Sequence, residues 1–125
     1  MANNKDFKVT NGIEPSSYYE KIGTTTISAG TATLDMSTGT VFTITAAADL
    51  TIAFSNPPAS GTVGHATLVL TNPAGDYTFT YGTAIEFEWG VAPTATAAST
   101  TDILTFMTVD GGTSYVGALS ISGAV

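Results

Sequence analysis

The single histidine, His65, is the first residue of this chain to consider as a catalyst. An imidazole acts as a general base only beside an oriented nucleophile and an acid that holds its tautomer. The G-x-S-x-G, H-E-x-x-H and phosphate-loop motifs, which supply such partners, are absent from the sequence. We therefore expect His65 to be a loop or strand-end residue and the protein not to be an enzyme.

The carboxylates offer a second kind of chemistry. Glu86 and Glu88 lie two residues apart in the run AIEFEW, which places both on one face of a strand. A glycosidase needs two carboxylates on opposite sides of the bond that it cleaves, so this pair fits a solvated strand face better. Calcium prefers clustered oxygens, and Asp76 and Asp102 join the two glutamates as candidate ligands. No EF-hand or comparable loop supports them, so we expect no cofactor, with calcium as the alternative.

Aromatic rings could provide a sugar-binding surface. Trp89, Tyr77, Tyr81 and Tyr115 each combine an apolar face with a polar edge. Their positions in alternating runs favour the protein core instead, and we expect Trp89 to point inward. A carbohydrate-binding surface stays open as an alternative, and it requires these rings to be exposed.

Composition indicates the fold class that must position these residues. The 125 residues include no cysteine, which excludes disulfides, thiolate metal sites and cysteine nucleophiles. Only 10% are charged, whereas 24 are threonine, a residue typical of strands rather than helices. We predict an all-β fold with one domain and a short appendage.

Positive charge is confined to one end of the chain. Lys5, Lys8 and Lys21 are the only basic residues, and the net charge is −7. Nucleic acids and anionic membranes both require basic surfaces, so we expect neither as a partner. We also expect no signal peptide and no membrane span, because the sequence has neither an apolar leader nor an uninterrupted apolar run.

The appendage comprises residues 1–23, and the β-domain comprises 24–125. We expect an extended segment that ends at Asn11-Gly12, followed by one helical turn with Ser17 and Glu20 in capping-box spacing. The apolar residues of this arm are too few for a core of their own, so they must pack on the body, a sister chain or a partner. The candidate docking residues are Lys5, Phe7, Lys8, Val9, Tyr18, Tyr19 and Lys21.

The β-domain contains about nine short alternating runs. We predict an antiparallel β-sandwich or a jelly roll. Hairpins are expected around Ala29-Gly30 and around Asp110-Gly111-Gly112, where glycine permits tight turns. Two more are expected, one joining the runs 40–45 and 50–54, the other joining 65–71 and 77–81.

The last hairpin is apolar on both faces, which is typical of central strands covered on both sides. We expect another subunit to supply the second cover, in a homotrimer. The candidate interface residues are Met107, Val109, Tyr115, Leu119 and Ile121.

Two stretches resemble proteins of tailed phages. The opening NNKDFKVTNGIEPSSYYEKIGT resembles an N-terminal segment shared by structural proteins of marine and other tailed phages. The stretches LDMSTGTVFTITAAADLTIAFSNPPASGT and FEWGVAPTATAASTTDILTFMTVDGGTSYVGAL resemble a β-rich module of phage fibre and virion-surface proteins.

This resemblance implies a non-enzymatic structural protein of the virion. It would be displayed on the particle surface, as a head decoration or head fibre in preference to a tail fibre, and docked through its arm on capsid or tail proteins. The alternative is a carbohydrate-binding adhesin module of a tail fibre, with a host surface glycan as its ligand.

Overall fold

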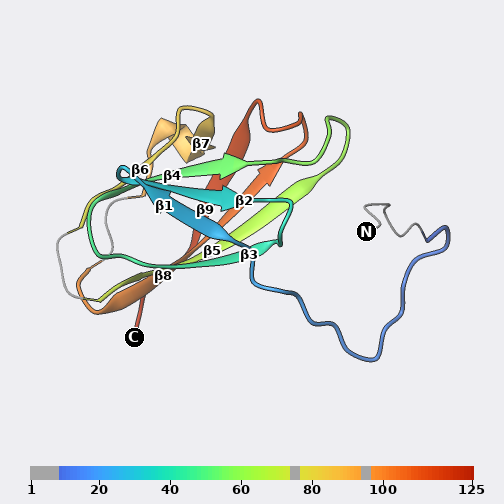
Figure 1. The fold of residues 1–125 in the computed structure, drawn as a ribbon, viewed down its shortest axis with the longest axis horizontal. Coiled ribbons are helices and arrows are strands. Elements are labelled where there is room, and N and C mark those ends of the chain that lie inside the picture. The colour runs from blue at the N-terminus through green and yellow to red at the C-terminus, as the bar shows by residue number, and fades with distance from the viewer. Residues whose placement is uncertain (1–8, 74–76, 94–96) are drawn as a thin grey trace.

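The computed structural model describes residues 9–73, 77–93 and 97–125. These residues form an all-β, sandwich-like fold in which two sheets lie face to face (Figure 1). The described strands are β1 (Thr25–Ser28), β2 (Thr31–Asp35), β3 (Val41–Thr45), β4 (Leu50–Ser55), β5 (Gly64–Asn72), β6 (Phe79–Tyr81), β7 (Ile85–Phe87), β8 (Thr100–Thr108) and β9 (Tyr115–Ala124), and a 3-10 turn, η1 (Glu88–Gly90), follows β7.

Both sheets are mixed. One has the strand order β1-β2-β4-β6 and the other β3-β5-β8-β9-β7. The pairs β2/β4, β4/β6, β3/β5 and β7/β9 are parallel, whereas β1/β2, β5/β8 and β8/β9 are antiparallel. The sandwich-like all-β architecture is thus confirmed, and the prediction that the sheets are antiparallel throughout is wrong, because four of the pairs are parallel.

The predicted hairpins have different outcomes. The turn at Ala29-Gly30 joins β1 to β2, and both residues have positive φ (49° and 78°), as a tight hairpin requires. The other two expected pairs, β3 with β4 and β5 with β6, are wrong because each pair is divided between the two sheets. The chain crosses after β3, where Ala46 is buried and its N–H donates to the Thr71 carbonyl at 2.8 Å.

Alternating apolar side chains fill the space between the sheets. Phe42 and Ile44 of β3 and Leu68 and Leu70 of β5 point inward, as their spacing predicts. The remaining buried apolar side chains come from both sheets and include Leu34, Leu50, Ile52, Phe79, Leu104 and Phe106.

An aromatic cluster extends this core toward β7. Phe54 stacks on Tyr115 at 4.6 Å and packs edge-to-face on Phe106 at 5.1 Å. Phe87 packs edge-to-face on the other side of the cluster, with its ring centroid 6.1 Å from that of Phe106. Gly117 leaves room for the Phe87 ring, because a Cβ at this position would lie 2.7 Å from it. The cluster fixes the base from which β7 and η1 project.

Candidate functional site

The residues considered for catalysis and metal binding do not converge. His65 and Glu86 are both exposed, and Met107 and Val116 lie between them in register on the outer face of their sheet. Within the described ranges, no group of three His, Asp or Glu side chains is placed to hold a metal. Asp76, the fourth calcium candidate, lies outside the described residues.

Asp102 has a structural partner instead. Its side chain is buried on the core side of β8, where its Oδ1 accepts a hydrogen bond from the Gly123 N–H at 2.8 Å. The bond ties the end of β9 to β8. Burial, together with the nearby Asp102 charge, raises the pKa of Tyr81 to about 12.

Asp110 organises the turn between β8 and β9, as predicted. Its carboxylate accepts hydrogen bonds from the Thr108 hydroxyl at 3.0 Å and from the Ser114 hydroxyl at 2.7 Å and backbone N–H at 3.0 Å. These bonds, led by those from Ser114, lower the pKa of Asp110 to about 2. Gly111 and Gly112 supply the positive φ angles.

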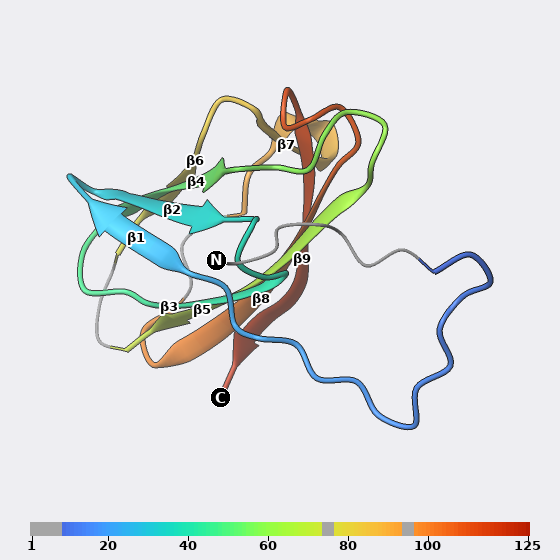
Figure 2. The same ribbon diagram turned by 45° about the vertical axis from the view of Figure 1, so that its right-hand side comes forward.

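The arm extends away from the body (Figures 1 and 2). Residues 9–22 are all exposed, including Ile13 at 71%, Tyr18 at 74% and Tyr19 at 89%. These residues form no helix, so the predicted helical turn is wrong; an isolated turn has an unfavourable nucleus and here has nothing to pack against. Lys5, Phe7 and Lys8 lie outside the described residues.

Among the described residues of the arm, those that are fixed to the body lie at its base. Thr40 donates a hydrogen bond to Glu20 at 2.6 Å, and Ile22 forms a parallel bridge with Val41. Gly39 lies so close that a Cβ there would be 2.6 Å from the Lys21 carbonyl oxygen. The arm therefore leaves the free edge of β3 from a defined position.

The interface candidates on the last two strands divide into two groups. Met107, Val109, Leu119 and Ile121 are between 39% and 53% exposed. Tyr115 is only 4% exposed and belongs to the core of the single chain, so it is not available for a contact between subunits. β8 is central in its sheet, as predicted.

Trp89 does not point inward, so that prediction from the alternating pattern is wrong. The residue is 91% exposed. The alternating pattern assumed a strand through Trp89, whereas β7 ends at Phe87 and the chain turns at η1. There Trp89 adopts a left-handed conformation (φ 58°, ψ 17°), and its Nε1–H donates to Glu88 Oε1 at 3.1 Å.

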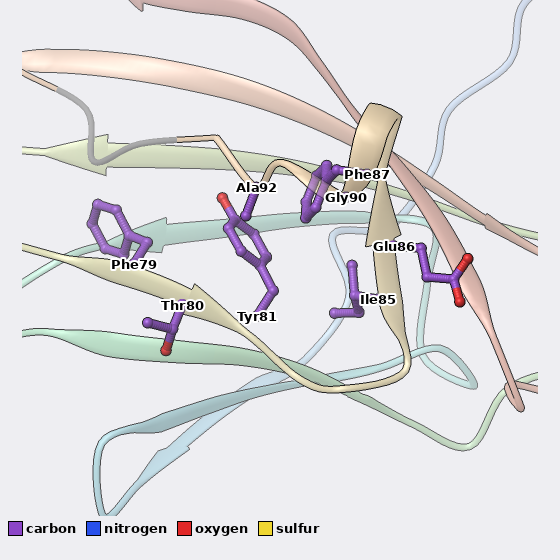
Figure 3. Close-up of a pocket in the computed structure, with 8 residues that line it drawn as sticks. All are labelled: Phe79, Thr80, Tyr81, Ile85, Glu86, Phe87, Gly90 and Ala92. Atoms are coloured by element: carbon purple, nitrogen blue, oxygen red, sulfur yellow. The ribbon is translucent and has the colours of Figure 1, made fainter.

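A hollow of about 390 Å³ lies beside this turn (Figure 3). Tyr81 and Phe87 meet in it edge-to-face, with ring centroids 4.6 Å apart. Its lining residues come from β6, β7 and the η1 segment, namely Phe79, Thr80, Tyr81, Ile85, Glu86, Phe87, Gly90 and Ala92. A strand end, an exposed ring and a partly aromatic hollow thus lie together.

No protein-family profile, curated protein or solved structure matches this chain. Over the residues that the structure describes, no helix has the length and apolar character needed to cross a membrane.

Proposed function

We propose that this chain is a non-enzymatic structural protein of a tailed-phage virion, displayed on the particle surface and docked through its N-terminal arm. The docking partners are other virion proteins, and a position on the head is favoured over the tail. The resemblance of the opening segment to the N-terminal segments of phage structural proteins supplies the context.

The exposure of the arm carries this proposal. Ile13, Tyr18 and Tyr19 are more than two-thirds exposed and have no cover from their own body. Apolar side chains gathered on one uncovered segment are typical of surfaces that bind a partner. The hydrogen bond from Thr40 to Glu20 and the bridge at Ile22 hold the base of the arm in place, so the body stays at a fixed point beside the partner.

Charge supports the same division of roles. The three lysines of residues 1–22 are balanced by Asp6, Glu14 and Glu20, so the arm has no net charge, whereas residues 23–125 carry seven carboxylates and no cation. Like charge repels one body from another at long range, so bodies can associate only through an uncharged apolar face, whereas contacts through the arm meet no such repulsion. An acidic body displayed outward also keeps particles apart.

A homotrimer is part of this proposal. Its contact surface would be the outer face of β8 and β9, where Met107 and Val116 lie opposite each other in register and are 42% and 59% exposed. An apolar pair at this position would gain stability when a neighbouring chain covers it.

Deletion of residues 1–21 tests the docking role. The cut retains Ile22 and Gly23, whose contacts with Val41 hold β3, so we expect a folded β-body with an unchanged circular dichroism spectrum. We expect this body to be absent from particles, as measured by quantitative blotting of purified virions. Gold labelling of intact particles with an antibody against residues 22–125 should mark the head.

A double substitution in the arm gives a finer version of this test. Tyr18→Ala with Tyr19→Ala removes two exposed rings without shortening the chain, and it should reduce incorporation. Trp89→Ala is the matched control, because it removes an equally exposed ring from the body and should leave incorporation unchanged. Full occupancy of the truncated protein in particles would contradict the proposal.

A further inference from the structure

We propose that the η1 turn and the adjoining hollow form a binding site for a neutral sugar, with Trp89 as the platform on which the sugar ring stacks. This inference concerns a ligand of the isolated chain and does not depend on the docking role of the arm.

The backbone of the turn holds Trp89 outward. A left-handed conformation is costly for a residue with a Cβ, and for a bulky residue it is an outlier that often marks a functional site. Trp89 adopts this conformation and leaves 91% of its side chain in solvent. Burial therefore does not offset the backbone strain at Trp89. A ring that binds a ligand would account for both the strain and the exposure.

Glu88 orients the ring and adds a polar group at its edge. The hydrogen bond from Trp89 Nε1 to Glu88 Oε1 restricts rotation of the indole. Among the described residues, Trp89 is the one hydrogen-bond partner seen for the Glu88 side chain, so this carboxylate keeps acceptor sites for hydroxyl groups. A flat apolar face beside acceptor oxygens matches a sugar, whose C–H face is apolar and whose edge carries hydroxyls.

The hollow lies next to the turn that carries the ring. Trp89 does not itself line it, but Gly90, the following residue, and Ala92 do, so a ligand longer than one sugar could reach from the ring into the hollow. Figure 3 shows the Tyr81 ring directed toward Ala92 and Phe87. The Tyr81 hydroxyl, with a pKa of about 12, stays protonated at neutral pH and can donate a hydrogen bond.

Charge selects the class of sugar. No lysine or arginine follows Lys21, and the Glu88 carboxylate is hydrogen-bonded to Trp89, so a sialylated or phosphorylated glycan stacked on the ring would meet a like charge and no cation of the β-domain. A cationic ligand such as choline is normally enclosed by several rings. Here Tyr81 and Phe87 pack on each other and on the core, which leaves Trp89 as one open platform.

The site also lies away from the arm. In both views of the ribbon, η1 stands at the upper edge of the body and the arm leaves from the lower side (Figures 1 and 2). A ligand at Trp89 and a partner on the arm can therefore be bound together.

The full chain can report on this site directly, because Trp89 is its single tryptophan. Intrinsic fluorescence would be recorded during titration with neutral gluco-, galacto- and manno-oligosaccharides, with sialyllactose and with choline. We expect a saturable blue shift with at least one neutral oligosaccharide and none with the charged compounds. The proposal would be overturned if no neutral oligosaccharide shifted the emission of Trp89, or if only choline or sialyllactose did.

Substitutions distinguish sugar binding at Trp89 from nonspecific binding to the protein surface. The affinity of each variant for the sugar would be measured by calorimetry. Trp89→Ala should weaken binding about tenfold, whereas Trp89→Phe, which keeps a flat ring, should retain most of it. Tyr19→Ala removes a ring of similar exposure from the arm and should have no effect. Equal affinity of Trp89→Ala and the unmodified chain would overturn the assignment.

Deleting residues 1–21 should leave the affinity for sugar unchanged. A failure of the sugar-binding proposal can therefore be distinguished from a failure of the docking role of the arm.

Discussion

Two turns of this molecule share a backbone conformation and differ in the residues that adopt it. Trp89 and Gly90 have φ angles of 58° and 69°, and Gly111 and Gly112 have φ angles of 73° and 81°. In the second turn both left-handed residues are glycines, which adopt positive φ without steric cost. In the first turn the same conformation is imposed on the largest side chain in the chain.

The two turns differ in how well their residues suit the backbone conformation. At 110–112, each residue suits its turn: the glycines fit the backbone, and Asp110 accepts hydrogen bonds that close the loop. At η1 the backbone would accept glycine or asparagine more readily than tryptophan. Because Trp89 is exposed as well as strained, neither local conformation nor burial accounts for it, and the proposed sugar site gives it a role.

The largest expected effect concerns Gly112. A Cβ there would lie 2.5 Å from the Tyr115 hydroxyl and 2.6 Å from Pro57 Cγ, and its φ of +81° adds backbone strain. Gly112→Ala should therefore reduce the free energy of unfolding by about 2–4 kcal/mol, measured by urea denaturation.

Gly90→Ala is the matched control for this substitution. It also places a Cβ at positive φ, +69°, but no atom lies within 4 Å of that Cβ. The loss should be only about 1 kcal/mol, from backbone strain alone. Equal losses at the two glycines would show that crowding around Tyr115 does not distinguish the turns.

A smaller effect is expected from the titration of Asp110. Its pKa is lowered from 3.8 to about 2 in the folded protein, so folding favours the carboxylate form. The stabilisation is fully present above pH 4 and is lost as the pH falls toward 2. Asp110→Asn should flatten the dependence of thermal stability on pH across this window, measured by circular dichroism melts.

Ser114→Ala gives a graded version of that test. It removes the hydroxyl that donates to Asp110 Oδ2 at 2.7 Å and keeps the backbone N–H of residue 114, which donates to both carboxylate oxygens. Ser114→Ala should therefore flatten the slope between pH 4 and pH 2 only in part, and less than Asp110→Asn does. A slope equal to that of the unmodified chain would contradict the role assigned to Ser114.

Much of the fold could be predicted because the relevant physics is local. The alternation of apolar and polar residues predicts which side chains of β3 and β5 share a face. The pair Asp110-Gly111 predicts the last turn. Sheet membership was not predictable in this way, because a strand in either sheet of a sandwich shows the same inward and outward pattern. For this reason the sequence predicts a hairpin of β3 with β4, although the two strands belong to different sheets.

The candidate sites show the same limit. The arm was recognisable from Lys5, Lys8 and Lys21 and from its lack of a core. Trp89 was misplaced because alternation was extended two residues too far. One signal was available: Trp-Gly followed by Val-Ala-Pro interrupts a strand, since glycine and proline commonly mark its end.

The smallest expected effect is also the most direct comparison of the two turns. Trp89→Asn replaces a strained, exposed ring by a residue that tolerates positive φ, so it should raise the free energy of unfolding by about 0.5–1 kcal/mol in urea denaturation. Tyr19→Asn, at an equally exposed ring outside any strained turn, should change it by less. If Trp89→Asn lowers stability, the indole contributes to the fold, and the strain at η1 no longer points to a ligand. If stability rises while sugar affinity falls, the chain keeps a less stable residue at this turn for binding.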